Sequence, residues 1–341
     1  MSVGPKPETK AVNIDWTCAE IGGLWSAYLQ ETMAVCFLTY FVHHLQDAEI
    51  VPLAQEALDL SRKRVDKMKA FFQAENFPVP AGFSENDVNL AAPPLFLDSF
   101  SLSFVYMMNR LSMISYSFIA SSTVRLDVLD FFNECLRECT EMFGKAVRML
   151  LEKGLYDRPP FMNYPEQVEY VQKESFLDGI WGRKRRLSAV ELTEIFFNIE
   201  RNYFSVTLML GFAQVLEDKN LRDLALQGKK ISEHQIDLFN TLLQEEDLLG
   251  VMSVNMVVTD STASPFSEKL ILAMIHTLNS VDIVLIAHAL SLAMRADLAA
   301  NYSRLIAQIM AYGKDTFDAV VERRWLEQPP LTTDRKQLMK S

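Results

Sequence analysis

Glycine and proline are scarce in this chain. The 341 residues include only 12 glycines and 13 prolines, whereas 49% of all residues are hydrophobic. A β-sandwich or barrel needs turn residues at short intervals, and a disordered chain has too few apolar residues for a core, so the composition argues against both classes. It predicts a helical globular protein with the length of about two domains.

Cysteine and positive charge are also in short supply. The four cysteines form no CxxC pair, so we expect reduced, mostly buried thiols rather than a disulfide scaffold. The net charge of −11 argues against nucleic acid as a partner, because nucleic acids bind positively charged surfaces. The basic run 183–186 is therefore predicted to be a solvated hinge or a local partner for acidic surface, with a nucleic-acid contact as the alternative.

Targeting and membrane segments are not predicted either. Residues 1–14 lack the apolar run of a signal peptide and are expected to form a flexible tail. Residues 99–124 and 270–294 are apolar enough to resemble membrane spans, but Arg110 and Asp282 lie near their centres. A central ion in lipid costs at least about 2.5 kcal/mol, so we expect no membrane span and a cytoplasmic protein.

What the chain does contain is an internal repeat. An offset of 171 residues, which becomes 170 after a one-residue deletion, brings similar residues into register along the whole length. Because one offset with one gap is enough, we predict an internal duplication. The aligned pairs include Glu20 with Glu191, Glu75 with Glu246, Asn109 with Asn279, Arg125 with Arg295, Asp127 with Asp297, and Pro159–Pro160 with Pro329–Pro330.

The sequence pattern predicts four helices in each copy. In the first copy they span residues 18–45, 49–75, 94–121 and 125–153. The third is apolar on all faces and should be buried. The fourth helix of the first copy is expected to stop at Gly154 and the proline pair, and that of the second copy at its own pair, because proline donates no backbone hydrogen bond. We predict a first four-helix bundle at 15–160, a linker at 161–186, a second bundle at 187–331 and a tail at 332–341. Ser188 should cap the second bundle, with Glu191 completing a capping box.

Several segments resemble a known family. The loop PVPAGFSENDVNLAAPPLF, the VRLD turn, the RPPF stop and the linker SFLDGIWGRKRRL are similar to those of a ferritin-like family of unknown function from spore-forming bacteria, whose members are often labelled spore coat proteins. The resemblance covers nearly the whole chain. It implies a ferritin-like bundle in each half and a role in sporulation, but offers no catalytic residues to carry over. The second copy has lost most acids of the loop, so a site on that loop is not expected there.

A ferritin-like bundle invites a di-iron centre, which needs a Glu from each of two helices and an ExxH pair from each of two others. No residue three positions before any of the five histidines is acidic. Glu31 and Glu138-x-x-Glu141 could ligate a metal in the first copy, but Asn202 and Gln308 occupy the positions aligned with Glu31 and Glu138. We therefore predict no metal site and no cofactor.

Other catalytic patterns are missing from the sequence as well. It contains no glycine-rich phosphate loop, no GxSxG elbow and no Cys–His pairing that spacing supports. No catalytic residue is predicted, and the sequence leans against an enzyme. His276 and His288 are expected to pack at helix contacts, with ligand binding as the alternative.

Polar residues that both copies keep are the remaining candidates. Arg125 and Asp127, and likewise Arg295 and Asp297, should lie where the third helix meets the fourth. There the Asp can accept first-turn hydrogen bonds and the Arg can reach a neighbouring carboxylate. The alternative is a shared ligand site.

Asn109 and Asn279 lie midway along the third helices. If these helices face each other across a pseudo-twofold axis, the amides would fix their register and Arg110 would approach Asp282.

These observations predict an all-α protein of two tandem ferritin-like four-helix bundles related by internal duplication. The predicted function is non-enzymatic association, with protein partners or with itself, in sporulation or the spore coat, and the location is cytoplasmic or spore-associated. The alternative is a bundle that holds a metal or a small hydrophobic ligand, because the 16 methionines, some clustered at Met107, Met108 and Met113, adapt to irregular apolar shapes.

Overall fold

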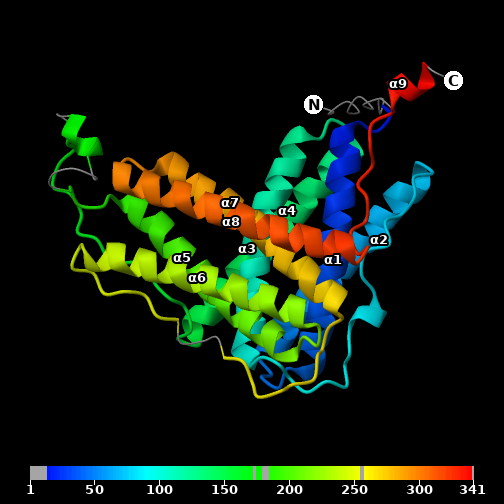
Figure 1. The fold of residues 1–341 in the computed structure, drawn as a ribbon, viewed down its shortest axis with the longest axis horizontal. Helices are drawn as coiled ribbons and strands as arrows, with labels where there is room; N and C mark the ends of the chain where they lie inside the picture. The colour runs from blue at the N-terminus through cyan, green and yellow to red at the C-terminus, as the bar shows by residue number, and fades with distance from the viewer. Residues whose placement is uncertain (1–13, 172–173, 179–183, 254–256, 340–341) are drawn as a thin grey trace, which may run out of the picture.

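The protein is described by a computed structural model that covers residues 14–171, 174–178, 184–253 and 257–339. Helices dominate these residues, and no β-strand occurs among them, which confirms the predicted all-α class (Figure 1). The predicted boundaries of the first four helices agree with the structure to within a few residues. The long helices are α1 Cys18–His44, α2 Ile50–Ala74, α3 Asp98–Ser122, α4 Leu126–Glu152, α5 Ala189–Val215, α6 Lys219–Gln244, α7 Glu268–Leu292 and α8 Ala296–Glu322.

Three short helices complete the described elements. They are η1 Glu85–Asp87 in the loop before α3, η2 Glu174–Leu177 in the linker and α9 Arg335–Leu338 near the C-terminus. The predicted N-terminal tail lies outside the described residues, apart from position 14, as do parts of the predicted linker and the last two residues of the C-terminal tail.

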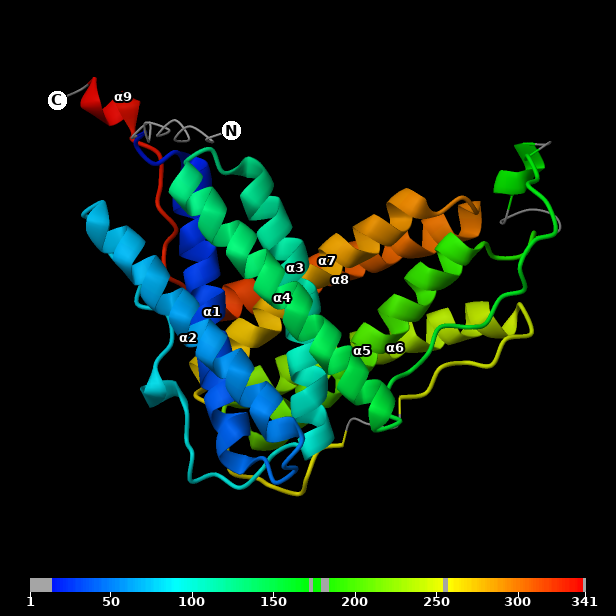
Figure 2. The same cartoon turned by 180° about the vertical axis from the view of Figure 1, so that it is seen from behind.

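The long helices form two units of four. Helices α1 to α4 pack on one another, as do α5 to α8, and in each unit the first helix pairs with the second and the third with the fourth. This arrangement fits the predicted duplication. The two units diverge from a common end, where the long loops before α3 and α7 cross (Figure 2).

Both units begin with the same cap. The hydroxyl of Thr17 accepts a hydrogen bond from a first-turn N–H of α1, and Glu20 reaches back to complete a capping box. Ser188 and Glu191 do the same for α5, which confirms the predicted cap. The cap satisfies donors that the first turn of a helix would otherwise leave unpaired.

The fourth helix of each unit ends at a left-handed residue. Gly154 has φ +68° and Arg324 has φ +56°. The next N–H bonds back to the carbonyl of Leu150 at 2.8 Å in the first unit and of Val320 at 3.0 Å in the second, which is a Schellman motif. The expected stop at Gly154 is confirmed. The expectation that the proline pairs stop these helices is wrong, because each helix ends before its proline pair begins.

The largest apolar core is shared by the two units. Phe37 of α1 lies 4.2 Å from Phe266, centroid to centroid, and Phe100 of α3 stacks on Phe204 of α5 at 5.2 Å. Each buried phenylalanine contributes about 1.5–3 kcal/mol by burial. We call the rings that line this contact the phenylalanine seam: Phe37, Phe96, Phe100 and Phe104 from the first unit, and Phe204, Phe212 and Phe266 from the second.

The loops before α3 and α7 also join the units through backbone hydrogen bonds. Two isolated antiparallel bridges pair Val88 with Phe266 and Phe96 with Val258. The backbone N–H of Asn89 donates to the carbonyl of Pro265 at 2.8 Å. At Gly211 of α5 a Cβ atom would lie 2.7 Å from the ring of Phe96, so glycine is what lets the first loop approach the second unit so closely.

Helix α3 is buried on all faces only in its first half. Residues Phe100 to Met107 are buried against the seam, whereas Phe118 is 61% exposed. The prediction of full burial is wrong for the second half, because the two units diverge there and leave the outer face of α3 uncovered.

Helix α7 is apolar enough, by length and composition alone, to cross a membrane. Half of its most apolar 18-residue window is buried inside the protein. Leu270, Ile271 and Ile275 of this helix belong to the shared core. The core helix of a globular protein meets the same criterion, so the apolar character of α7 is accounted for by packing.

Replacing Arg324 by glycine is expected to stabilise the protein by about 1 kcal/mol, because a side chain in the left-handed conformation costs about that much. Gly154→Arg at the aligned position should destabilise the protein by a similar amount. Urea unfolding of the two variants and the parent chain measures both changes. If Arg324→Gly lowered the stability, the left-handed residue would not be the source of strain.

Candidate functional site

The centre of the first unit holds a buried group of charged and polar side chains, one from each helix. Arg64 of α2 donates from Nη1 to Glu31 of α1 at 3.0 Å and from Nε to Glu138 of α4 at 3.2 Å. The hydroxyl of Tyr116 of α3 donates to the same oxygen of Glu31 as Arg64 does. At the surface, Lys63 pairs with Glu138 at 2.9 Å. The guanidinium group thus lies between two buried carboxylates.

This centre does not fit a di-iron site. Glu31 and Glu138 are the carboxylates that could ligate a metal there, but a positive guanidinium group occupies the space between them. Glu141 pairs at the surface with Arg137 instead. In the part of the chain that the structure describes, no group of three or more His, Cys, Asp or Glu side chains is arranged to hold a metal ion.

The groups around Arg64 that could act as nucleophiles are protonated at neutral pH. Burial raises the pKa of the Tyr116 hydroxyl well above its usual value, and it raises the pKa of the Cys139 thiol to about 12. Burial likewise raises the pKa of Cys135, one turn earlier on α4. Reactive cysteines have lowered pKa values, so these thiols are packing groups.

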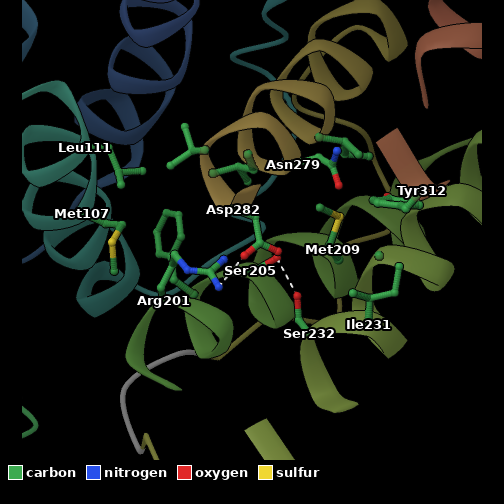
Figure 3. Close-up of a pocket in the computed structure, with 15 residues that line it drawn as sticks. Met107, Leu111, Arg201, Ser205, Met209, Ile231, Ser232, Asn279, Asp282 and Tyr312 are labelled. Atoms are coloured by element: carbon green, nitrogen blue, oxygen red, sulfur yellow. Dashed lines mark hydrogen bonds and ion pairs between the residues drawn. The ribbon is translucent and has the colours of Figure 1, made fainter. Parts of the chain in front are cut away.

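The centre of the second unit is also buried and polar, but its residues differ. Arg201 of α5 forms an ion pair with Asp282 of α7 at 2.6 Å (Figure 3). Gln235 of α6, which aligns with Arg64, accepts hydrogen bonds from Arg201 at 3.2 Å and Asn202 at 3.0 Å. Its own amide donates to Asp282 at 3.1 Å. Asn202 aligns with Glu31, so neutral amides occupy both aligned positions. In the second centre Arg201 and Asp282 carry the charges, and a buried polar network is still present.

The predicted approach of Arg110 to Asp282 is wrong. Arg110 of α3 forms an ion pair with Glu200 of α5 at 2.8 Å, and its guanidinium carbon lies 3.5 Å from the ring centroid of Phe197. Arg110 still joins the two units, but its partner lies on α5 because α3 crosses α5 beside the seam. Burial raises the pKa of Glu200, and Arg110 opposes that rise.

The asparagines shared by the two copies lie in separate places. Asn109 donates to the carbonyl of Val105 in its own helix at 2.8 Å and lines a hollow in the first unit. Asn279 lines the hollow beside Arg201, to which Met107 and Leu111 of the first unit also contribute, and a Cβ atom on Gly313 of α8 would lie 2.5 Å from its amide nitrogen. Each amide therefore belongs to the interior of its own unit.

The other shared residues meet at one corner of each unit. Arg125 binds Asp127 through two nitrogens, each at 2.9 Å, and also pairs with Glu75. Glu20 accepts the backbone N–H groups of Val124 and Arg125 at 2.8 and 3.0 Å. We call these four side chains, Glu20, Glu75, Arg125 and Asp127, the first corner cluster.

The second corner cluster repeats the first with the aligned residues. Arg295 binds Asp297 at 2.7 Å and Glu246 at 2.9 Å, while Glu191 accepts the N–H groups of Met294 and Arg295. In both copies the arginine donates to two carboxylates of the same unit, and Arg295 also donates from Nη1 to the backbone carbonyl of Arg185 in the linker at 3.0 Å. The repeat alignment could have indicated this grouping, because Glu20 aligns with Glu191 and Glu75 aligns with Glu246. Spacing in the sequence, however, does not show that these glutamates contact the arginines.

The basic run of the linker pairs with acidic residues of the second unit. Lys184 lies 2.9 Å from Glu245 and 3.3 Å from Asp297, and Arg185 lies 2.8 Å from Glu191. The prediction of a local partner for acidic surface is confirmed for these two residues. Arg183 lies outside the described residues.

The two histidines that differ between the copies have different surroundings. His276 is half-buried, with Nδ1 3.2 Å from the hydroxyl of Thr316 on α8, as expected at a helix contact. His288 is mostly exposed, with Nδ1 3.2 Å from Glu194, so the prediction of a packed ring is wrong for it. It lies on the part of α7 that the first unit does not cover.

Three small hollows lie along helix α3, which lines each of them. One of about 40 Å³ lies beside Arg64, one of about 70 Å³ lies between α1, α3 and α7, and one of about 30 Å³ lies beside Arg201 (Figure 3). Neighbouring hollows share lining residues: Glu31 and Met108 line the first and second, and Leu111 and Leu278 line the second and third. The hollows therefore run from one buried centre to the other across the boundary between the units.

A larger groove of about 670 Å³ lies between α1, α2 and the loop at residues 81–90. Cys36 lies at its floor, and burial raises the pKa of this thiol to about 12. Arg62, Asp66 and Lys69 of α2 also line the groove. Its size is that of a small-molecule site, but the charges of both signs on α2 select no particular ligand chemistry.

The fold and the buried centres define a class of all-α protein, in which two four-helix units share one aromatic core. The chain belongs to the family described as "Protein of unknown function (DUF3231)", which it matches once over residues 9–168 and again over residues 175–338. These two matches correspond to the two predicted copies. The predicted membership of a family of unknown function is therefore confirmed.

No curated protein matches the chain. Among solved structures, the chain is similar to a "putative spore coat protein" from Bacillus halodurans C-125, with a TM-score of 0.39 and 17% sequence identity. The match covers 43% of this chain and 96% of that one. A TM-score of this size does not establish a shared fold.

Replacing Arg295 by methionine is expected to destabilise the protein by about 3 kcal/mol, because the change removes a buried guanidinium group and leaves the partly buried Glu246 and Asp297 without its charge. The side chain of Arg295 is 1% exposed, whereas that of Arg125 is 13% exposed. Arg125→Met should therefore cost less, about 1–3 kcal/mol. Chemical unfolding of both variants measures the difference, and equal losses would show that burial does not set the strength of these clusters.

The glutamates of the corner clusters should make stability depend on pH. Burial alone would raise the pKa of Glu20 and Glu191, but hydrogen bonds from Thr17 and the α3–α4 corner, and from Arg185 and Ser188, outweigh it and lower both to about 2. A lowered pKa stabilises the folded state fully above the ordinary value of 4.5, and that stability is lost as the pH falls towards 2.

The expected result is a loss of unfolding free energy between about pH 5 and pH 2 that is smaller in Glu20→Gln and Glu191→Gln. Each variant should also lose about 1.5–3 kcal/mol at neutral pH. Urea unfolding across this pH range is the measurement. A variant that kept the full acid sensitivity of the parent chain would contradict the assignment.

Proposed function

We propose that this chain is a structural protein with two ferritin-like bundles that acts by associating with other protein chains, in sporulation or the spore coat. The main support for association is the exposure of large apolar side chains at the start of the linker, residues 161–171. Phe161, Tyr164, Val168 and Tyr170 are 84%, 92%, 84% and 84% exposed there. Large apolar side chains grouped on one surface segment are typical of protein interfaces.

The chemistry of this linker segment suits a protein partner. Phenylalanine and tyrosine bring a large contact area at a small loss of side-chain entropy, and the tyrosine hydroxyl adds a hydrogen-bonding group. Glu166 and Glu169 lie between these residues, so the segment combines apolar contacts with negative charge. The segment is not helical, which leaves it free to follow the shape of a partner surface.

The two buried centres support a structural role rather than a catalytic one. In both, arginine and carboxylate groups from different helices bind one another and so hold the helices together. The thiols and the phenol near the first centre have raised pKa values, the opposite of what an activated nucleophile needs.

The assignment to sporulation is the finer part of the proposal and is supported by the resemblance of the loop, turn and linker segments. It is tested separately, by measuring the abundance of the protein through growth and sporulation of its host. The proposal expects accumulation during sporulation and recovery with the purified spore. Accumulation confined to vegetative growth would refute this part and leave association standing.

Association is tested with a photo-crosslinking amino acid at Tyr164 in the full chain. We expect a crosslinked product of defined mass, because the side chain is exposed and apolar surface flanks it on both sides. The matched control is the same amino acid at Met310 of α8, which is 59% exposed but lies on a regular helix. Equal crosslinking at both positions would contradict a role for the linker.

A triple variant, Phe161→Ser, Tyr164→Ser and Tyr170→Ser, completes this test. Because the three side chains are exposed, the variant should keep the stability of the parent chain to within about 0.5 kcal/mol. It should also lose the assembled form that the parent chain shows in sedimentation. If the folded variant kept the assembled form, the proposed role of the linker would be contradicted.

A further inference from the structure

The hollow of about 70 Å³ between α1, α3 and α7 has an unusual lining. Its floor is formed by buried apolar groups from both units, among them Met33, Phe104 and Met274. Half-buried polar groups, Gln30 and Thr277 among them, lie towards the surface. The hollow is therefore an apolar pocket at the boundary between the units, with a polar mouth.

Glu31 is the single charged side chain among the described residues that line this hollow. It is only 4% exposed. Its oxygen Oε1 accepts hydrogen bonds from Arg64 and Tyr116, whereas Oε2 has no hydrogen-bond partner within the described ranges. A buried acceptor without a partner is costly, so a ligand that supplies a donor there gains binding energy.

The charges connected to Glu31 favour a cation over a neutral donor. Lys63 and Arg64 supply two positive charges, while Glu31, Glu134 and Glu138 supply three negative charges. The connected group thus carries one excess negative charge. Arg64 lines the neighbouring hollow but not this one, so Glu31 is the charged side chain that a cation entering this hollow meets.

We propose that this hollow binds the ammonium group of a small primary alkylamine, with the nitrogen donating to Oε2 of Glu31. The alkyl chain lies among Met33, Met108 and Met274, whose flexible thioethers adapt to its shape. The rings of Phe104 and Tyr116 line the same space and can attract the ammonium group.

The volume limits the size of the ligand. A cavity of about 150 Å³ holds a benzene molecule, so about half that volume suits an amine of two to four carbons. The adjoining hollow beside Arg64 shares Glu31, Ala34 and Met108 with this one, which leaves some room for a longer chain. So small a ligand binds weakly, with a Kd on the order of millimolar.

Among the described residues, the first unit alone has this chemistry. Asn202 aligns with Glu31, and its amide binds Gln235 within the second centre. In the hollow beside Arg201, the lining carboxylate is Asp282, which already pairs with Arg201 at 2.6 Å. The proposal therefore expects one amine per chain, independently of whether the chain associates through its linker.

Calorimetric titration of the full chain with propylammonium chloride tests the proposal, with 1-propanol and sodium propionate as comparators of the same length. Propylammonium should bind with a stoichiometry of one and about tenfold tighter than 1-propanol, and propionate should not bind. The absence of propylammonium binding, or equal binding of propionate, would overturn the proposal.

Three variants locate the site. Glu31→Gln removes the charge but keeps an acceptor for Tyr116 and Arg64, and it should weaken propylammonium binding about tenfold or more. Glu141→Gln removes one charge from the exposed face of α4 and should leave binding unchanged. Unaltered affinity in a folded Glu31→Gln protein, or equal weakening in Glu141→Gln, would refute the site.

Ala34→Phe keeps the test valid if Glu31→Gln fails to fold. Ala34 is half-buried and lines both the hollow of about 70 Å³ and its neighbour, so a larger ring there fills the space and leaves Glu31 and Arg64 themselves unchanged. Binding of propylammonium should be lost in this variant while its helical circular dichroism is kept. Undiminished binding would place the amine elsewhere and overturn the proposal.

Discussion

The phenylalanine seam is the contact on which the rest of the structure depends. Phe37 and Phe266 touch although they belong to opposite halves of the chain, and Phe100 stacks on Phe204 in the same way. Neither unit can complete its apolar core alone, because rings from the other unit fill part of it. The seam also fixes the position of α7 against α1 and α3, and so creates the hollow beside Glu31.

The buried centres show two solutions to one problem. A four-helix unit whose interior contains charged groups must place opposite charges beside one another, because a buried charge without a counter-charge costs several kcal/mol, roughly 3–5. The first unit does so with Arg64 between Glu31 and Glu138, and the second with Arg201, Gln235 and Asp282. Since these groups come from different helices, both networks also select one arrangement of the helices.

Much of the fold follows from the sequence pattern, and the failures have a common cause. Periodicity and capping residues located the helices, and the repeat alignment identified Arg125, Arg295 and their aspartates. Periodicity reports which face of a helix is buried but not what covers it, so the shared core and the Arg110–Glu200 pair were not predictable. Arg64 lies in a basic stretch of the sequence that suggests an exposed side chain. It nevertheless shares a helix face with Leu60 and Met68, and this spacing could have indicated its burial.

The joining of both units in one chain has a consequence for symmetry. Two identical subunits meeting at a twofold axis would present the same residue at every equivalent place, so any change would appear twice. Here Glu31 and Arg64 have Asn202 and Gln235 as their counterparts, and each position has been able to change alone. A duplicated gene can therefore give one half a chemically distinct interior while the other half keeps the scaffold that supports it.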